Sequence, residues 1–304
     1  MRYRILIALS LVASPAYSQQ VTRYPPRTDS VEVVLLGTGT PVPDANTAGP
    51  STAVVVGSRL FVVDAGSGVQ RRLTAAGLPN NKFEAVFITH LHSDHVLGLS
   101  DLIFTSWIFG RATPLRIFGP PGLMRMTDHL VAAFAEDISV RTKPNEYGIP
   151  NGYRVRAREV MPGVIYDSAG VRVTAIQVPH GAWKYSYAYR FDTPTRSIVI
   201  SGDTRESEAI TRAATGVDVL VHEVVSLESL TQRPGTFGGD IQRYMRSAHT
   251  PDKKLGELAA KANPKLLVLT HIVPTGVADS VLINGIRSGG FKGQIAVGHD
   301  LDRF

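Results

Sequence analysis

The stretch Thr89-His90-Leu91-His92-Ser93-Asp94-His95 decides how the rest of the chain is interpreted. It places three imidazoles and a carboxylate within six residues, directly after a short apolar run. A buried imidazole without a partner costs about 1 to 3 kcal/mol, and a metal ion is a partner that His and Asp can share. His90 and His92 leave the same face of an extended segment, while Asp94 and His95 can turn to a second point if a helix begins there. The spacing therefore predicts two adjacent metal ions.

Further along the chain, four apolar runs typical of buried strands also end on residues that bind metals or transfer protons. These residues are His180, Asp203, the pair His222-Glu223, and His271. If the strands lie side by side, their ends converge along one edge of a sheet, where the site of a layered α/β protein is expected. The chain has no cysteine, so any metal must be held by His, Asp or Glu.

The motif His90-x-His92-x-Asp94-His95 resembles the signature of the metallo-β-lactamase superfamily. Other segments are similar to its ribonuclease Z branch, namely Leu35-Leu36-Gly37-Thr38-Gly39-Thr40-Pro41, Val63-Asp64-Ala65-Gly66, Gly119-Pro120-Pro121-Gly122 and Ser201-Gly202-Asp203-Thr204. The similarity runs from about Val31 to the C-terminus. It implies a single α/β domain, the four-layer αββα sandwich, in which two mixed sheets face each other, helices lie outside and the metals lie at one edge.

The resemblance also implies the ligands of two zinc ions. His90, His92 and His180 would hold the first ion, Asp94, His95 and His271 would hold the second, and Asp203 would bridge both. The two ions would share a water molecule and make it a hydroxide near neutral pH. Asp94 would orient this hydroxide and accept its proton.

Two further segments are similar to the ribonuclease Z motifs that contain a glutamate and a histidine: His222-Glu223 and Ser247-Ala248-His249-Thr250. Departure of an alkoxide requires a proton or a second electrophile. We therefore expect His249 to donate a proton to the leaving oxygen and Glu223 to orient His249.

Taken together, these features predict a ribonuclease Z-like, zinc-dependent hydrolase that cleaves phosphodiester bonds in a small-molecule or nucleotide-like ester. Transfer RNA is not expected as a partner, because only twelve residues (191–202) lie where many family members insert an arm that grips tRNA. A homodimer is possible, since dimers are common among the family. The alternatives are an arylsulfatase, a lactonase or a β-lactamase, and, outside enzymes, a periplasmic zinc-binding protein.

The N-terminus has the pattern of a secretory signal peptide. Arg2 and Arg4 precede an apolar run over 5–13, and Ala16-Tyr17-Ser18 supplies small residues for cleavage near Ser18. The expected organisation is a signal peptide over 1–18, an extended lead-in over 19–30 and the hydrolase domain over 31–304. The mature protein would then be periplasmic or secreted, without a membrane anchor.

Composition adds two expectations. With 43% apolar and 19% charged residues, the 304-residue chain is typical of a globular protein. The formal net charge of +6 is not gathered in a run of basic residues, which favours a solvated surface over a nucleic-acid groove.

Several local features are interpreted as structural. Asp64, which ends an apolar run, is expected to brace the metal loop as a hydrogen-bond acceptor. Gly37-Thr38-Gly39 is expected to form a turn, because Val42 stands where the third glycine of a dinucleotide fingerprint belongs. His129 and His299 are assigned structural positions. A helix is expected over Leu97 to Phe109.

Overall fold

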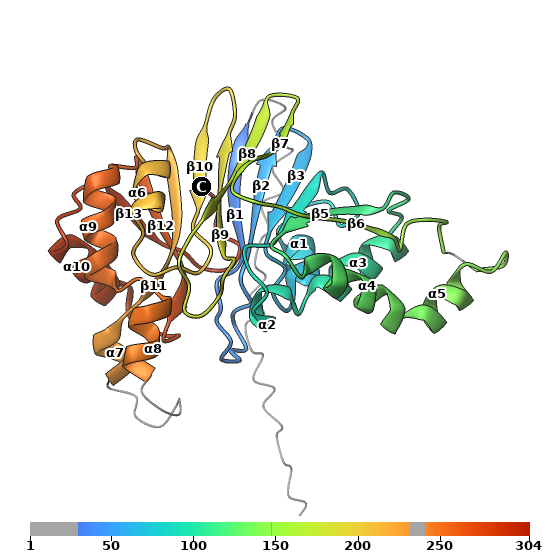
Figure 1. The fold of residues 1–304 in the computed structure, drawn as a ribbon, viewed down its shortest axis with the longest axis horizontal. Coiled ribbons are helices and arrows are strands. Elements are labelled where there is room, and N and C mark those ends of the chain that lie inside the picture. Colours follow the sequence, from blue (N-terminus) through green and yellow to red (C-terminus); the bar gives the residue numbers. More distant parts are fainter. Residues whose placement is uncertain (1–29, 147, 232–240) are drawn as a thin grey trace, which may run out of the picture.

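Two β-sheets face each other in the computed structural model, which describes residues 30–146, 148–231 and 241–304 (Figure 1). Within this part of the chain the first sheet contains, in spatial order, β1 (Val31–Gly37), β2 (Ser51–Val56), β3 (Arg59–Val63), β4 (Ala85–Phe87), β5 (Leu115–Gly119) and β6 (Val155–Glu159). The second contains β13 (Gln294–Val297), β12 (Leu266–Val273), β11 (Val219–Val225), β10 (Ser197–Ile200), β9 (Tyr187–Asp192), β8 (Val171–Gln177) and β7 (Gly163–Ser168).

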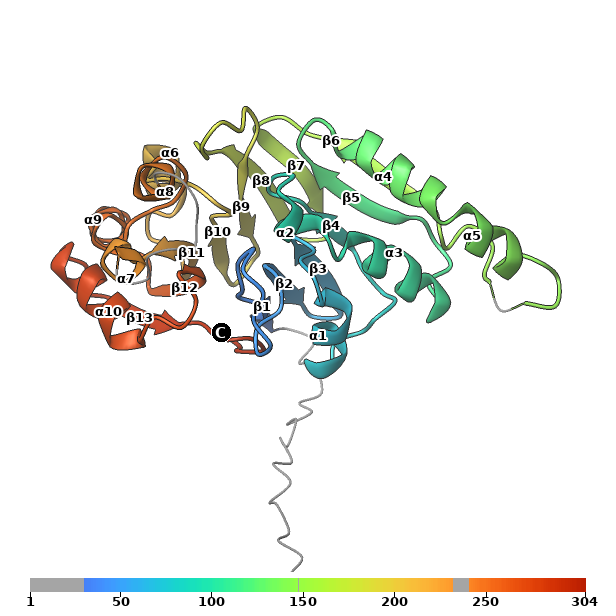
Figure 2. The ribbon, with the colours of Figure 1, turned by 90° about the horizontal axis from the view of Figure 1, so that it is seen from below.

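Helices cover the outer face of each sheet (Figure 2). The helices that follow strands of the first sheet are α1 (Val69–Ala75), α2 (Ser93–Val96), α3 (Leu99–Ile108), α4 (Leu123–Ala133) and α5 (Ala135–Arg141). Those associated with the second sheet are α6 (Glu208–Ala213), α7 (Leu227–Thr231), α8 (Ile241–Ala248), α9 (Asp252–Ala262) and α10 (Asp279–Ser288). This arrangement is the predicted αββα sandwich, so the predicted fold class is confirmed.

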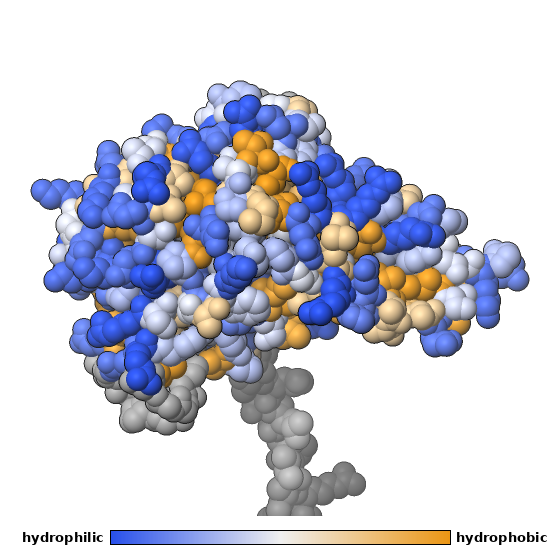
Figure 3. Space-filling view, in the orientation of Figure 1, coloured by the Kyte–Doolittle hydropathy of each residue, from blue (hydrophilic) through white to orange (hydrophobic). Residues whose placement is uncertain are grey.

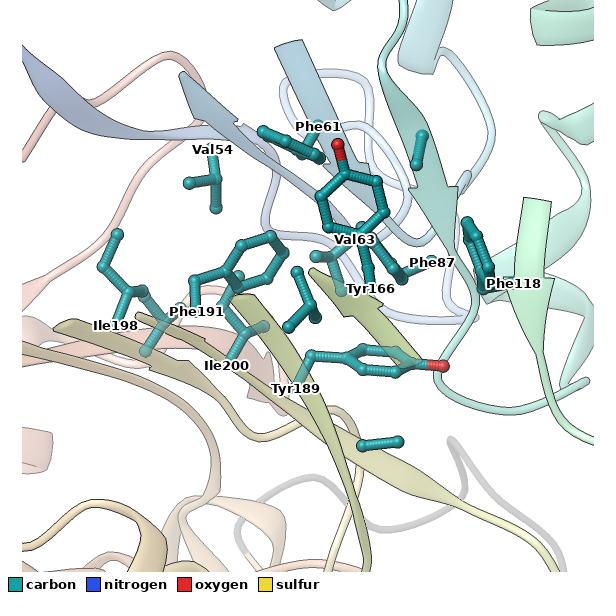
Figure 4. Packing of buried hydrophobic residues seen from close by; sticks show 14 of the residues in the cluster. Val54, Phe61, Val63, Phe87, Phe118, Tyr166, Tyr189, Phe191, Ile198 and Ile200 are labelled. Atoms are coloured by element: carbon teal, nitrogen blue, oxygen red, sulfur yellow. The ribbon is translucent and has the colours of Figure 1, made fainter. Parts of the chain in front are cut away.

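The core between the sheets is rich in aromatic residues (Figure 4). Phe87 of β4 lies with its ring centroid 5.3 Å from that of Phe118, 5.4 Å from Tyr189 and 5.6 Å from Phe191. Its neighbour Val86 points the other way, into the layer between the first sheet and its helices. Because β4 is buried on both faces, its C-terminal end, which carries the histidine stretch, is held in a fixed position.

Strand direction explains why distant residues meet. β3, β4, β5 and β6 are mutually parallel, and so are β10, β11, β12 and β13. The C-terminal ends of parallel neighbours lie at one edge of a sheet. His90 follows β4 and Asp203 follows β10, and the structure brings the two side chains together.

The strand that contains His271 is irregular at that residue. Glu223 pairs with Thr270 and Val224 with Ile272, so His271 is left without a partner in the ladder. Its φ of 44° lies in the left-handed region. Bulges of this kind re-aim a side chain and are common beside active sites. The sequence predicted that the strand would end before His271, whereas β12 continues past it to Val273.

The helix expected over Leu97 to Phe109 is confirmed as α3, which begins at Leu99 and ends at Ile108. The shorter helix α2 ends just before it, at Val96. Gly98 lies between them, and a Cβ atom there would be 2.1 Å from the carbonyl oxygen of Gly66. β7 was not predicted. The short segment over 191–202 lies within a hairpin of β9 and β10.

The predicted signal peptide over 1–18 and nearly all of the lead-in over 19–30 lie outside the described residues, so both stay predictions. Among the residues that are described, no helix is both long and apolar enough to cross a bilayer.

Candidate metal centre

Three imidazoles converge at the edge shared by the two sheets. His90 Nε2 lies 3.0 Å from His92 Nδ1, and His180 Nε2 lies 3.1 Å from the same atom. His90 and His180 are buried. His90 and His92 follow β4 and His180 follows β8, so the group joins both sheets. Three nitrogens at this spacing can all contact one ion at the usual zinc–nitrogen distance of about 2.0 Å.

A second group lies beside the first. His271 Nε2 is 3.3 Å from Asp94 Oδ2, and His95 Nε2 is 3.5 Å from the same oxygen. Asp94 and His95 lie in α2, which begins directly after His92, and the ring of His95 lies beside that of His90, with 4.2 Å between the ring centroids. All three side chains are buried.

Asp203 lies between the two groups. Its Oδ2 is 4.0 Å from His90 Nε2 and 3.6 Å from His271 Nε2, and its Oδ1 is 3.3 Å from His95 Nε2. Asp203 Oδ1 and His95 Nε2 are both buried without a hydrogen bond among the described residues. Buried polar atoms left in this way need another partner. The donor set and these two atoms therefore fit a metal centre that includes Asp203.

The outer nitrogens of three histidines are held by the protein. His95 Nδ1 contacts Asp64 Oδ2 at 2.8 Å, and His180 Nδ1 contacts the carbonyl oxygen of Ala248 at 2.7 Å. His90 Nδ1 lies 3.0 Å from Thr89 Oγ1, whose hydroxyl donates to Asp64. When the outer nitrogen donates a hydrogen, the inner nitrogen is free to bind a metal. The structure therefore confirms that Asp64 braces the metal loop.

Burial and neighbouring charges set the protonation of the cluster. Burial lowers the pKa of His90 well below its usual value, and it lowers the pKa of His92 to about 4. These rings are neutral at pH 7, the form that binds metals. Burial would also lower the pKa of His95, but Asp203 and Asp64 raise it well above its usual value. The carboxylates of Asp203 and Asp64 thus create a negative potential at His95, and this potential would also favour a bound metal cation.

Glu223 and His249 form a pair that reaches the centre. His249 Nδ1 lies 3.3 Å from Glu223 Oε2 and 4.0 Å from Asp203 Oδ2. The other oxygen of Glu223 accepts the backbone N–H of Thr250 at 2.8 Å, which fixes the carboxylate. Burial lowers the pKa of His249, but Glu223 and Asp203 outweigh it and raise this pKa to about 9. His249 is therefore protonated at neutral pH in the metal-free protein and can act as a donor.

A cavity of about 210 Å³ opens beside these residues. Its lining includes the polar residues His92, Asp94, Asp203, His249 and His271. The rest of the lining is largely apolar and includes Pro41, Val42, Ile241, Tyr244, Met245 and Val273. An apolar lining with a few polar groups is the usual form of a substrate site.

The structure brings all nine predicted site residues together: His90, His92, Asp94, His95, His180, Asp203, Glu223, His249 and His271. Their individual roles stay predictions. His129 and His299 lie on the surface, as expected, and the side chain of His299 is 65% exposed. Sequence reasoning missed Trp183, whose Nε1 lies 2.6 Å from Nε2 of His92. No motif marked it, since it is a single aromatic residue in a loop.

We expect Asp64→Asn to weaken metal binding. The substitution replaces the carboxylate that accepts from His95 Nδ1, so the ring loses its fixed orientation. Loss of such an outer contact lowers metal affinity by about 10- to 100-fold. Competition with a chromogenic chelator measures this affinity directly. Asp300→Asn is the matched control, because Asp300 also accepts backbone N–H groups, from Thr38 and Ala48, but contacts no residue of the centre. Equal affinity in Asp64→Asn and wild type would contradict the assignment.

The family model described as "Beta-lactamase superfamily domain" matches residues 59–272 of the chain. Among relatives, Ribonuclease Z of Mycobacterium bovis (strain BCG / Pasteur 1173P2) is 34% identical over 277 residues, covering 90% of this chain and 97% of that protein. Ribonuclease Z of Mycobacterium sp. (strain KMS) is 36% identical over 278 residues, covering 90% and 95%.

Solved structures share the fold. The metallo-β-lactamase fold protein YhfI from Bacillus subtilis superposes with a TM-score of 0.68 at 19% identity, covering 91% of this chain and 99% of that one. The short form of human tRNase Z superposes with a TM-score of 0.66 at 20% identity, covering 90% and 98%.

The expectation that tRNA is not a partner was wrong. The relatives that match 90% of the chain at 34 to 36% identity are Ribonuclease Z proteins, and a tRNase Z shares the fold. That expectation depended on the short segment over 191–202, which does not alter the residues of the centre.

Proposed function

Because the chain belongs to the metallo-β-lactamase superfamily and, within it, to the ribonuclease Z-like hydrolases, we propose that it cleaves phosphodiester bonds of RNA, with tRNA-like molecules as substrates, at a centre of two zinc ions. The observation that supports this proposal most strongly is the contact of the Glu223–His249 pair with Asp203. A donor for an alkoxide leaving group is placed beside a metal-binding carboxylate, and RNA cleavage by water produces such a leaving group.

The proposed ligands are the two groups described above, with Asp203 shared between them. When bound, the ions would supply a nucleophile from water near neutral pH and neutralise charge on the phosphoryl group. Asp94 faces the cavity, where its carboxylate can orient the attacking water and accept its proton. His249 donates a proton to the leaving oxygen. Glu223 holds His249 in place and favours its charged form.

Export is a separate proposal. It is supported only by the N-terminal pattern of Arg2, Arg4, an apolar run and small residues. The full chain fused at its C-terminus to alkaline phosphatase, an enzyme active only after export, tests it. Activity that is lost when residues 2–18 are deleted would support export, and activity absent from the intact fusion would contradict it.

Metal analysis coupled to a substrate panel tests the proposed activity. The purified protein should contain about two equivalents of zinc and should cleave RNA with a 3′ extension and bis(p-nitrophenyl) phosphate. Hydrolysis of an aryl sulfate, a lactone or a β-lactam, without cleavage of either phosphodiester, would contradict the proposal and favour one of those activities instead. Treatment with a chelator should abolish turnover, and added zinc should restore it.

A further inference from the structure

An alternating row of arginines begins at Arg154, directly before the edge strand β6, and continues with Arg156 and Arg158 within it. Arg154, Arg156 and Arg158 are all exposed, and Arg116 of β5 lies directly beside Arg156 in the parallel register. Side chains two residues apart in a strand point to the same face. These four residues, named here the arginine stripe, therefore share one face of the sheet.

Nothing among the described residues covers this face of β6. Val155 and Ala157, which alternate with the arginines, pack on the other side against the core that includes Leu123 and Met126 of α4. Figure 2 shows α4 running along the outer side of β6. Strongly hydrophilic side chains gather over β5 and β6 on the face seen in Figure 3. The stripe thus lies on open surface at the end of the first sheet.

Most of the charge in the stripe is not neutralised. Arg116 forms an ion pair with Glu84 at 3.2 Å. Within the described part of the chain, Arg154, Arg156 and Arg158 have no acidic partner. Glu159, the acidic residue of β6, does not pair with these arginines. Its Oε1 accepts the backbone N–H groups of Gly122 and Met124 at the start of α4.

Protection of the sheet edge does not account for the stripe. Charged side chains discourage pairing of an edge strand with another chain, but that role does not require arginines to be placed against one another. Arg116 and Arg156 stand directly opposite each other, and like charges in that arrangement are destabilising. The stripe therefore places three unneutralised charges on one face at some cost to stability, which points to an anionic ligand.

The position of the stripe relates it to the metal centre. β6 is parallel to β5 and β4, so Arg158 lies toward the edge from which the histidine stretch extends. With strands about 4.8 Å apart, β6 lies roughly 10 Å across the sheet from β4, and the row from Arg154 to Arg158 spans roughly 13 Å along the chain. A mononucleotide in the cavity cannot cover both places. A polymer with regularly spaced phosphates can.

We propose that the arginine stripe binds the phosphate backbone of an RNA substrate outside the scissile bond. This inference rests on the proposed function, since it assigns RNA to the same site. The stripe would be a second RNA-binding surface besides the metal centre. The segment over 191–202, which is only a hairpin, is too short to form an RNA-binding arm. Arginine suits this role because its guanidinium pairs with phosphate through two hydrogen bonds.

The test compares two variants with the same loss of charge. The first combines Arg154→Gln, Arg156→Gln and Arg158→Gln. The matched control combines Arg71→Gln, Arg212→Gln and Lys292→Gln, which removes three exposed cations from other faces of the molecule. Both are made in the full chain, loaded with zinc and checked by thermal denaturation. An RNA hairpin with a 3′ extension and bis(p-nitrophenyl) phosphate serve as substrates, and fluorescence anisotropy with the already cleaved hairpin measures binding.

The stripe variant should show a KM for the RNA raised by about tenfold or more, with kcat and the turnover of bis(p-nitrophenyl) phosphate unchanged. In a plot of log affinity against log salt concentration, its slope should be less steep than that of wild type by about two to three. This is nearly one unit for each phosphate contact that is lost. The control should match wild type. RNA affinity and salt slope equal to wild type in the stripe variant would overturn the proposal, and so would an equal loss in the control. Because anisotropy needs no cleavage, a wild type that binds but does not cut RNA would overturn only the proposed function.

Discussion

Asp203→Ala is expected to reduce turnover of every substrate by about a thousandfold or more, because the proposed metal centre would lose the carboxylate that lies between its two groups of ligands. Asp203 Oδ2 lies within 4.0 Å of His90, His180 and His271, and Oδ1 lies 3.3 Å from His95. Without this carboxylate, His95 also loses the neighbour that raises its pKa most. The zinc content should fall from about two equivalents to about one or fewer.

The control for this substitution must separate loss of metal from loss of fold. Asp300→Ala removes another buried carboxylate, which accepts from Thr38 and Ala48 and pairs with Arg72. It should lower the free energy of unfolding while the zinc content and kcat stay near wild type. Full zinc content and activity in Asp203→Ala would rule out the shared-ligand assignment.

His249→Ala should distinguish substrates by their leaving groups. General acid catalysis contributes about 10²- to 10⁴-fold, so cleavage of RNA, which expels an alkoxide, should slow by that amount. Turnover of bis(p-nitrophenyl) phosphate should change little, because p-nitrophenolate is a stable anion that needs no proton. Steady-state kcat for both substrates, measured on zinc-loaded protein, gives the comparison.

Glu223→Gln is the companion variant. It keeps the shape of the side chain that contacts His249 and the backbone of Thr250, but it removes the charge that raises the pKa of His249. The same selective loss on RNA is expected, smaller than in His249→Ala. If kcat fell equally for RNA and for bis(p-nitrophenyl) phosphate in either variant, Glu223 and His249 would position the metal ligands and would not donate a proton to the leaving group.

Much of the centre could be predicted because several of its metal-binding side chains lie close together in the sequence. His90 to His95 form one local motif, and the rule that buried strands end at a common edge led to His180, Asp203 and His271. The fold was predicted from the family resemblance, and the burial of β1 and β4 on both faces agrees with it, because strands that are apolar on both faces must be covered on both sides.

The remaining features depend on relations that no local pattern contains. The bulge that aims His271 arises from pairing between β11 and β12. The break at Gly98 arises from its close approach to Gly66, a residue far away in the sequence. No run of basic residues marks the stripe, because Arg154, Arg156 and Arg158 alternate with Val155 and Ala157. The exposure of the arginine face depends on the tertiary packing around β6.

The most direct test of the metal centre is anomalous X-ray diffraction at the zinc absorption edge, from crystals of the zinc-loaded protein. Two peaks are predicted, one about 2.0 to 2.2 Å from nitrogens of His90, His92 and His180, and a second at a similar distance from Asp94, His95 and His271. Asp203 should lie between them. A crystal with no anomalous peak beside Asp203, or with its zinc bound elsewhere on the chain, would contradict the account.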